Sequence, residues 1–81
     1  MQIEILTPDA TVFEGEADSV VLPGIQGGFE ILNNHAPLIS ALREGTIKIT
    51  NGGNAQELAV KSGFVEVLNN HLTVCVEGLN D

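Results

Sequence analysis

No segment of this chain keeps a 3.6-residue apolar period over ten or more positions without a glycine or proline that interrupts it. A helix of any length is therefore not expected. Short apolar runs instead alternate with turn-forming residues at regular spacing, a pattern typical of antiparallel β structure. The sequence predicts an all-β fold, in which residues 1–81 form a single domain built as a β-sandwich or flattened barrel of about eight to ten strands.

The stretch from Leu22 to Leu42 has the densest turn signals. Two short apolar runs, Phe29–Leu32 and Leu38–Leu42, are bracketed by a Pro-Gly corner, a Gly-Gly pair and an Asn-Asn-His-Ala-Pro corner. A loop held at both ends loses little conformational freedom when it binds, so this stretch is also a candidate for partner recognition.

Glycine, proline and paired asparagines divide the other apolar runs into short strands. Thr7–Ala10 has the composition of a turn, Gly15 predicts a bend or bulge, and Pro23 is expected to end the strand before it. The predicted strands outside the 22–42 stretch are Gln2–Leu6, Thr11–Glu14, Ala17–Leu22, Gly45–Thr50, Ala55–Lys61, Gly63–Leu68 and His71–Glu77.

Turn signals fix the register of a first predicted hairpin. Closing the turn at residues 51–54 sets Lys48 opposite Glu57 on the outside and Ile47 opposite Leu58 on the inside. An opposite-charge pair outside and an apolar pair inside indicate a consistent antiparallel pairing.

A second predicted hairpin turns at the Asn-Asn pair of residues 69–70. Its closure sets Val67 opposite Leu72 and Val65 opposite Val74, which gives one apolar face. The Leu-Asn-Asn-His sequence of this turn also occurs earlier in the chain, before the His-Ala-Pro corner. We interpret the recurrence as shared turn chemistry, because a solenoid needs three or more copies of a longer unit.

Charge and hydropathy limit the classes of partner. Three basic residues against eleven acidic ones give a formal charge of -8, which repels phosphate backbones and anionic lipid headgroups. No apolar run approaches the roughly 20 residues of a membrane span, and no basic-then-apolar leader opens the chain. We therefore expect a mature soluble chain with no nucleic acid partner and no direct membrane insertion.

Candidate catalytic and metal-binding residues are few. His71 and Cys75 would lie about 13 Å apart on one strand, too far to share a zinc ion, and His35 has no spaced ligand pair beside it. Cys75 lies in an apolar strand, where packing is its simplest role. Glu14 and Glu16 lie on an exposed strand without an apolar pocket that would make them an acid/base pair.

The glycine-rich segment Gly24–Gly28 is interpreted as a turn. It lacks the lysine and the Ser/Thr of a phosphate-binding P-loop and precedes no predicted helix. A chain of 81 residues is also too small for a deep catalytic cleft. The sequence therefore predicts no metal site, no cofactor, no small-molecule substrate and no catalytic activity, and it favours a binding or coupling module.

The motifs of the stretch from Leu22 to Leu42 resemble a known family. A Pro-Gly corner, a Gly-Phe strand and a His-Ala-Pro corner, in this order, resemble the N-terminal domain of the epsilon subunit of rotary proton-translocating ATP synthase, which is the delta subunit in mitochondria. Ser62–Val67, followed by Thr73 and Val74, resembles a second stretch of that family, and the resemblance runs through essentially the whole chain. The first set of matching residues is Leu22, Pro23, Gly24, Gly27, Phe29, Ile31, Leu32, His35, Ala36, Pro37, Leu38, Leu42 and Gly45.

Three departures from the family pattern are visible. The family commonly has Glu-Phe-Gly where this chain has Gly28-Phe29-Glu30, so the carboxylate is displaced by two residues. Asn33-Asn34 replaces a Pro-Gly pair before the histidine. The pair of C-terminal helices usual in the family, which inhibits rotation in longer relatives, is not expected here because the sequence stops at Asp81.

The resemblance implies a ten-stranded β-sandwich at the foot of the central stalk. Such a subunit is non-catalytic: it couples rotation of the c-ring to the gamma shaft, and thus proton flow to ATP synthesis, at the cytoplasmic face of the bacterial inner membrane. The residues implied to meet the c-ring are Gly24, Gly27, Gly28, Phe29 and Glu30. The residues implied to meet the gamma subunit are His35, Leu38 and Ser40.

Glu30 carries the only charge in the corner from Gly24 to Leu32, and two interpretations of it stay open. It could pair with a basic loop of the c-ring, or it could be merely solvated. The whole-chain alternative is a free-standing β module that binds a small ligand or carbohydrate, although the chain has three Phe and no Trp or Tyr for such a site. An enzyme would need a nucleophile or metal set that the sequence does not show.

Overall fold

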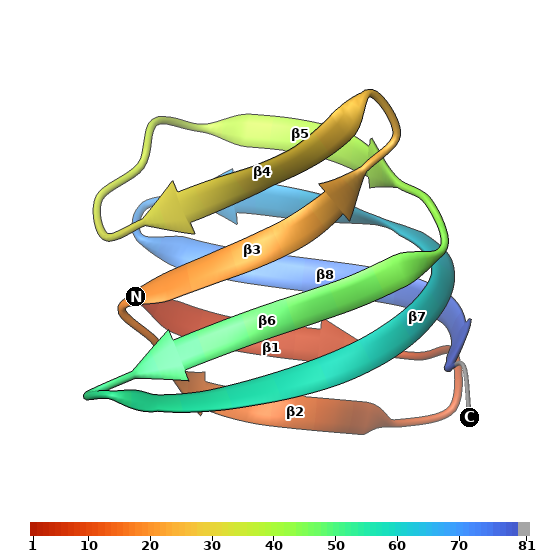
Figure 1. Cartoon of the computed structure of the whole chain (residues 1–81), viewed down its shortest axis with the longest axis horizontal. Helices are drawn as coiled ribbons and strands as arrows, with labels where there is room; N and C mark the ends of the chain where they lie inside the picture. Colours follow the sequence, from red (N-terminus) through yellow and green to blue (C-terminus); the bar gives the residue numbers. More distant parts are fainter. Residues whose placement is uncertain (80–81) are drawn as a thin grey trace.

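The computed structural model describes residues 1–79 and builds them from eight β-strands (Figure 1). Every regular element in this part of the chain is a strand, which confirms the all-β prediction. These residues include no helix of the length and apolarity that a membrane crossing requires. The strands are β1 (Gln2–Leu6), β2 (Thr11–Glu16), β3 (Ser19–Gly24), β4 (Gly27–Leu32), β5 (Leu38–Leu42), β6 (Gly45–Asn51), β7 (Asn54–Leu68) and β8 (His71–Leu79).

The strands form two layers joined by β7. We call β4-β3-β6 the front sheet and β2-β1-β8-β7-β5 the back sheet (Figure 1). The first half of β7 pairs with β6, and its second half pairs with β5 on one side and β8 on the other. One continuous strand therefore ties the two layers together.

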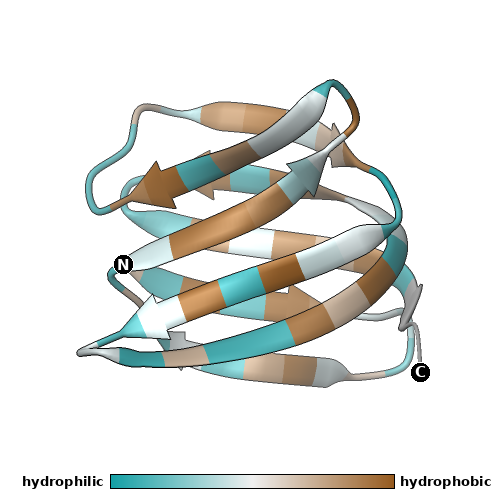
Figure 2. Cartoon of the chain, in the orientation of Figure 1, coloured by the Kyte–Doolittle hydropathy of each residue, from teal (hydrophilic) through white to brown (hydrophobic). Residues whose placement is uncertain are grey.

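The core lies between the two sheets. Every second residue along a strand points inward. Figure 2 shows apolar and polar positions alternating along the strands, as expected for sheets with one buried face. Phe13, Phe29, Leu38 and Leu58 pack against the edge of this core. The buried members are Met1, Ile3, Ile5, Ala17, Val20, Leu22, Ile31, Leu42, Ile47, Ile49, Val60, Val65, Val67, Leu72, Val74 and Val76.

Several local predictions are confirmed. The bounds of β1 and β5 are those predicted. Both hairpins have the predicted register, with Lys48 opposite Glu57 in the first and Val65 opposite Val74 in the second. Turn chemistry and alternation were sufficient for these pairs because both act between neighbouring residues.

The strand count differs from the ten implied by the resemblance, and β7 is one reason. Ala55–Lys61 and Gly63–Leu68, predicted as separate strands, form one strand because pairing with β8 continues past a register shift at Ser62. The expected break between them is a β-bulge, which bends a strand without ending it. The class of the fold is unaffected.

The sheet is not wholly antiparallel, which corrects a second prediction. β1 and β8 run parallel, with Ile3 opposite Leu72 and Ile5 opposite Val74. The first and last strands of the described chain are thus neighbours in the back sheet. Period-two alternation is the same in parallel and antiparallel pairs, so the sequence pattern could not distinguish them.

Gly15 was wrongly assigned to a break between strands. It lies inside β2, opposite Ile3, and the register shift falls instead between Ile5 and Leu6 on the partner strand. A glycine in a strand interior marks either a bulge or a close approach. Here the nearest atoms to a Cβ on Gly15 would belong to the Phe13 ring, at 3.6 Å.

Pro23 does not end β3, which continues to Gly24. The Arg43 N–H donates to the Pro23 carbonyl oxygen at 2.9 Å, so the missing N–H of Pro23 faces the same side of the strand. On that side the ladder with β6 ends at Val21, and the pairing with β5 is a single bridge, Gly24 opposite Leu42. A proline is tolerated there because it lies between two ladders, where at most one donor, toward Arg43, is lost.

Candidate partner-binding surface

The β3–β4 hairpin turns tightly at Ile25. Gly24 and Gly27 face each other across the turn, and Gly27 has a φ of +130°, which glycine adopts without strain. A Cβ atom on Gly24 would lie 2.6 Å from the Gly27 carbonyl oxygen and 2.7 Å from the Phe29 ring. The glycines therefore keep the turn narrow and leave Ile25 61% exposed at its tip.

This turn and β5 line a groove of about 440 Å³. The groove brings together most residues of the predicted c-ring set and one residue of the predicted gamma set. Ser40 of the gamma set therefore lies next to the c-ring set, whereas His35 and Leu38 do not line this groove. The predicted residues that line it are Gly24, Gly27, Gly28, Phe29 and Ser40.

Glu30 does not line this groove. It lies opposite Val21 on the outer face of the front sheet, and the next residue across that face is Lys48 of β6. The Glu30 carboxylate thus faces away from β5, and Val21 of β3 lies between it and Lys48. Its neighbour Phe29 points the other way, toward the core.

The His35 corner lies at the opposite end of β4 from the Ile25 turn (Figure 1). The ring Nδ1–H of His35 donates to the Ala36 carbonyl oxygen at 2.7 Å, and the side chain is exposed. Asn34 has a φ of 63°, and its N–H donates to Asn70 Oδ1 at 2.7 Å. The two Leu-Asn-Asn-His corners therefore lie side by side and brace each other.

Two residues of the predicted gamma set, Leu38 and Ser40, lie on β5 and point inward. Leu38 packs against the core, and the half-buried Ser40 donates its hydroxyl to the Ala41 carbonyl oxygen at 3.3 Å. Ile39, between them, is 72% exposed. Of this part of β5, Ile39 is the side chain most available to a partner.

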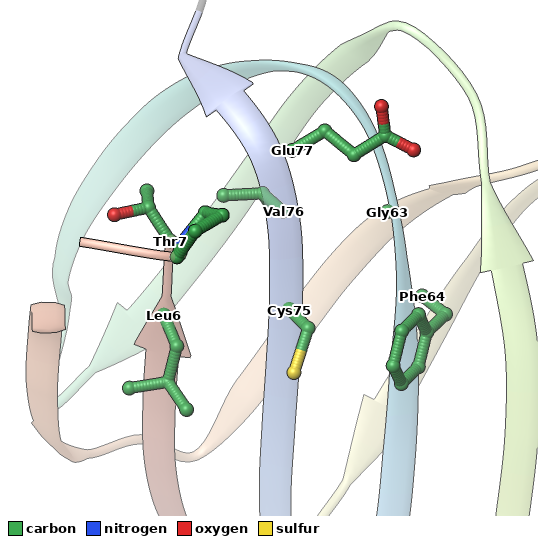
Figure 3. Close-up of a pocket in the computed structure, with 8 residues that line it drawn as sticks. Leu6, Thr7, Gly63, Phe64, Cys75, Val76 and Glu77 are labelled. Atoms are coloured by element: carbon green, nitrogen blue, oxygen red, sulfur yellow. The ribbon is translucent and has the colours of Figure 1, made fainter. Parts of the chain in front are cut away.

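The outer face of the back sheet exposes further apolar side chains. Phe64 and Leu68 of β7 are 51% and 48% exposed and point to the same side as Ile39. Beside Phe64 is a pocket of about 390 Å³ (Figure 3). It is lined by Leu6, Thr7, Pro8, Gly63, Phe64, Cys75, Val76 and Glu77.

No group of three or more His, Cys, Asp or Glu side chains close enough to hold a metal ion occurs within residues 1–79. His71 and Cys75 lie on the same face of β8, four residues apart. The candidate binding features of residues 1–79 are therefore the groove beside the Ile25 turn and the pocket beside Phe64.

Comparison with known proteins decides the family. Residues 1–80 match the family described as ATP synthase, Delta/Epsilon chain, beta-sandwich domain. The chain belongs to this family. The ATP synthase epsilon chain of Desulforamulus reducens is 42% identical over 94% of this chain and 58% of that protein. The epsilon chain of Gloeothece citriformis is 40% identical over 96% of this chain and 56% of that protein.

Two solved structures share the fold of this delta/epsilon β-sandwich domain. One is from the mitochondrial ATP synthase of Euglena gracilis, with a TM-score of 0.89, 15% identity, and coverage of 96% of this chain and 51% of that chain. The other is from the mitochondrial ATP synthase of Tetrahymena thermophila, with a TM-score of 0.81, 19% identity, and coverage of 99% and 65%. The chain spans a little over half the length of the curated relatives it matches.

The resemblance drawn from the Pro-Gly and His-Ala-Pro corners is thus confirmed for this delta/epsilon domain. Sequence reasoning missed Ile39 and Phe64 as surface residues. Strand alternation could have found Ile39, since Leu38 and Leu42 of the same strand are apolar and inward. The predicted hairpin could likewise have found Phe64, since it sets Val65 and Val67 on the inner face and so leaves Phe64 on the outer one.

Proposed function

We propose that this chain is a non-catalytic stalk component of a rotary proton-translocating ATP synthase. In this role it connects the c-ring to the gamma subunit, so that proton-driven rotation of the ring reaches the catalytic sites. The observation that carries the proposal is the match of residues 1–80 to the delta/epsilon β-sandwich family. It favours the stalk role over the free-standing ligand- or carbohydrate-binding module.

The fold is suited to transmit torque. Two sheets joined through β7 resist shear, because bending one sheet against the other would disrupt a continuous strand and a close-packed core. The related structures are of ATP synthase assemblies that include the c-ring in both cases and the central stalk in one. A stiff connector between two partners needs two attachment surfaces and no chemistry of its own.

The Ile25 turn is the proposed c-ring attachment: Gly24, Gly27, Gly28 and Phe29 line the turn side of the groove, and Glu30 lies on the outer face of the front sheet. The exposed Ile25 supplies apolar contact area, and the glycines let another backbone approach closely. Because Glu30 is exposed, an ion pair with a basic c-ring loop would contribute only about 0 to 1 kcal/mol to assembly.

The gamma attachment is assigned to the His35 corner and β5. His35 is exposed, whereas Leu38 and Ser40 contribute by holding the strand that presents Ile39. The proposed location is the cytoplasmic face of a bacterial inner membrane, reached through the c-ring. Curated relatives such as that of Desulforamulus reducens are ATP synthase epsilon chains.

Reconstitution tests the coupling role. ATP synthase of the source organism is assembled in vesicles with and without this chain, and ATP hydrolysis and ATP-driven proton pumping are measured together. We expect pumping per ATP hydrolysed to fall without the chain and to recover when it is added back. Equal pumping in both preparations would overturn the proposal.

Site-directed crosslinking tests the two attachments separately. Cys75 is the only native cysteine, so Cys75→Ser provides a background without thiols. Glu30→Cys is expected to crosslink to c subunits and His35→Cys to gamma in the assembled enzyme. If the two positions exchange partners, or if neither crosslinks, the assignment of these residues is wrong.

A further inference from the structure

The outer face of the back sheet carries two parallel rows of side chains with different chemistry. The strand register aligns an apolar row across β5, β7, β8 and β1, and beside it an acidic row that continues onto β2. The apolar row is Ala41, Phe64, Cys75 and Leu6. The acidic row is Ile39, Glu66, Thr73, Glu4 and Glu14.

The dimensions of these rows follow from sheet geometry. Neighbouring strands are about 4.8 Å apart, so the apolar row is roughly 14 Å long, and the acidic row lies two residues along each strand, about 7 Å away. A helix rises about 1.5 Å per residue, so some nine or ten residues of helix would cover the apolar row. One flank of such a helix would lie over the carboxylates.

Carboxylates dominate the charge on this face, and the N-terminal ammonium of Met1 lies 3.7 Å from Glu16 Oε2 at one end of it. The outward side chains of its strands include Glu4, Glu14 and Glu66, with Glu16 and Glu77 at its two ends. Of the three basic residues of the chain, Arg43 follows β5, Lys48 faces outward on the front sheet, and Lys61 lies within the register shift of β7, away from the two rows. In the strand register no carboxylate of the acidic row is paired with a Lys or Arg. The basic residue that these strands carry is Lys61, five residues before Glu66 on β7.

The pocket beside Phe64 lies at the β1 end of the apolar row. Figure 3 shows the side chains of Leu6, Cys75 and Phe64 next to one another on three neighbouring strands, with Glu77 at the rim. Its volume of about 390 Å³ accepts one large apolar side chain. Buried anchors of this kind supply most of the affinity of many protein interfaces.

We propose that this face binds an amphipathic helix of a partner subunit, whose apolar stripe covers the apolar row and whose lysine or arginine flank lies over the acidic row. The inference rests on the proposed function, since the gamma subunit would be the protein that carries the helix. It adds the chemistry of the contact: one large apolar anchor in the Phe64 pocket and at least two basic residues facing Glu66 and Glu4.

Charge complementarity selects this occupant over the others. A second copy of the chain would bring two acidic rows together, each on a molecule of formal charge -8. An anionic lipid surface would be repelled for the same reason. A helix with a basic flank can bury the apolar row under its apolar stripe and place positive charge over the acidic row.

A peptide assay tests the chemistry without any stalk subunit. The probe is a fourteen-residue helical peptide with leucines at i, i+3, i+4 and i+7 and lysines on one flank, and the matched control replaces each lysine with glutamate. The readout is alkylation of Cys75 by N-ethylmaleimide, because this half-buried thiol lies in the apolar row and is the only one in the chain. At ten times its Kd, the lysine peptide should slow alkylation about ten-fold by mass action.

Amide chemical shifts of the back-sheet strands should move with the lysine peptide at the same concentrations. If the glutamate peptide protects Cys75 as well as the lysine peptide does, the acidic row has no role and the proposal fails. It also fails if neither peptide protects the thiol, or if the shifts map to the front sheet.

Matched variants test the face in the assembled enzyme. Glu66→Gln and Glu4→Gln should each weaken binding of the chain to a gamma-containing complex about two- to five-fold at low salt, and both together should flatten the salt dependence. Glu57→Gln is the control, because it makes the same change on the same strand, β7, where that strand pairs with the front sheet. Equal effects of Glu66→Gln and Glu57→Gln would overturn the proposal.

The two proposals fail in different ways. If the chain assembles and couples normally but Glu66→Gln and the lysine peptide have no effect, the stalk role stands and the helix inference is wrong. If the lysine peptide binds the back sheet but the chain does not join a gamma-containing complex, the helix-binding face stands and the stalk role is wrong.

Discussion

Gly63 shows how one residue sets the path of a strand. It follows the register shift at Ser62, where β7 enters its pairing with β5 and β8. A Cβ atom here would lie 3.0 Å from Val76 Cα and closer still to the Cys75 carbonyl oxygen. The contact is with backbone of the neighbouring strand, so no side-chain rotation can relieve it.

Gly63→Ala is therefore expected to destabilise the fold by about 1 to 3 kcal/mol, the usual cost of overpacking. Urea denaturation measures the change in free energy of unfolding. Gly28→Ala is the matched control, because the nearest atom to its Cβ would be the Leu22 carbonyl oxygen at an ordinary 3.7 Å. Equal midpoints for the two variants would contradict the close approach at Gly63.

The paired asparagines give a second prediction at this scale. Asn69 and Asn70 have φ values of 52° and 60°, which glycine also adopts, but Asn70 Oδ1 in addition accepts the Asn34 N–H. Asn70→Gly should cost about 1 kcal/mol for the lost hydrogen bond, whereas Asn69→Gly should be nearly neutral. Thermal unfolding of the two variants checks this. Equal stability would show that the two corners do not brace each other.

At the scale of elements, alternation along β7 and β8 separates core from surface. Leu72 of β8 is fully buried, and Leu68 of β7, close to it across the same turn, is 48% exposed. Both are leucines at the ends of one hairpin. Their different burial follows from the pleat, which sends successive side chains to opposite faces.

Leu72→Ala is expected to lower the free energy of unfolding by about 2 to 5 kcal/mol, because it opens a cavity in the core. Leu68→Ala should change it by about 0.5 kcal/mol or less. Chemical denaturation followed by circular dichroism gives both values. A larger loss for Leu68→Ala would mean that the face of β7 is assigned the wrong way round.

At the scale of the whole molecule, the pairing of chain ends governs folding. β1 is the first strand and β8 the last, yet Gln2 lies opposite His71 in a parallel ladder. Such a contact forms only after most of the chain is ordered, and loop closure over this separation is entropically costly.

Refolding should accordingly take milliseconds to seconds, as for other all-β domains of high contact order, and Ile5→Val in β1 should mainly speed unfolding rather than slow folding. Stopped-flow refolding and unfolding in urea measure both rates. Microsecond refolding, or an Ile5→Val effect confined to the folding rate, would contradict a late β1–β8 pairing.

The sequence by itself determined the features that depend on near neighbours. These are the absence of a helical period, the positions of most turns, the register of the β6–β7 and β7–β8 hairpins, and the Pro-Gly and His-Ala-Pro corners that carry the family. Backbone sterics and the periodicity of side chains act over a few residues, so they can be predicted from the sequence alone.

Only the tertiary structure decided which distant strands became neighbours. The continuity of β7, the parallel β1–β8 pair, and the meeting of the β3–β4 turn with β5 in one groove all depend on how the whole chain buries its apolar faces. The acidic and apolar rows arise in the same way. Glu4 and Glu66 are far apart in sequence, but in the sheet only Thr73 of β8 lies between them. A sequence pattern fixes the face on which a side chain lies, whereas strand pairing fixes the side chains next to it.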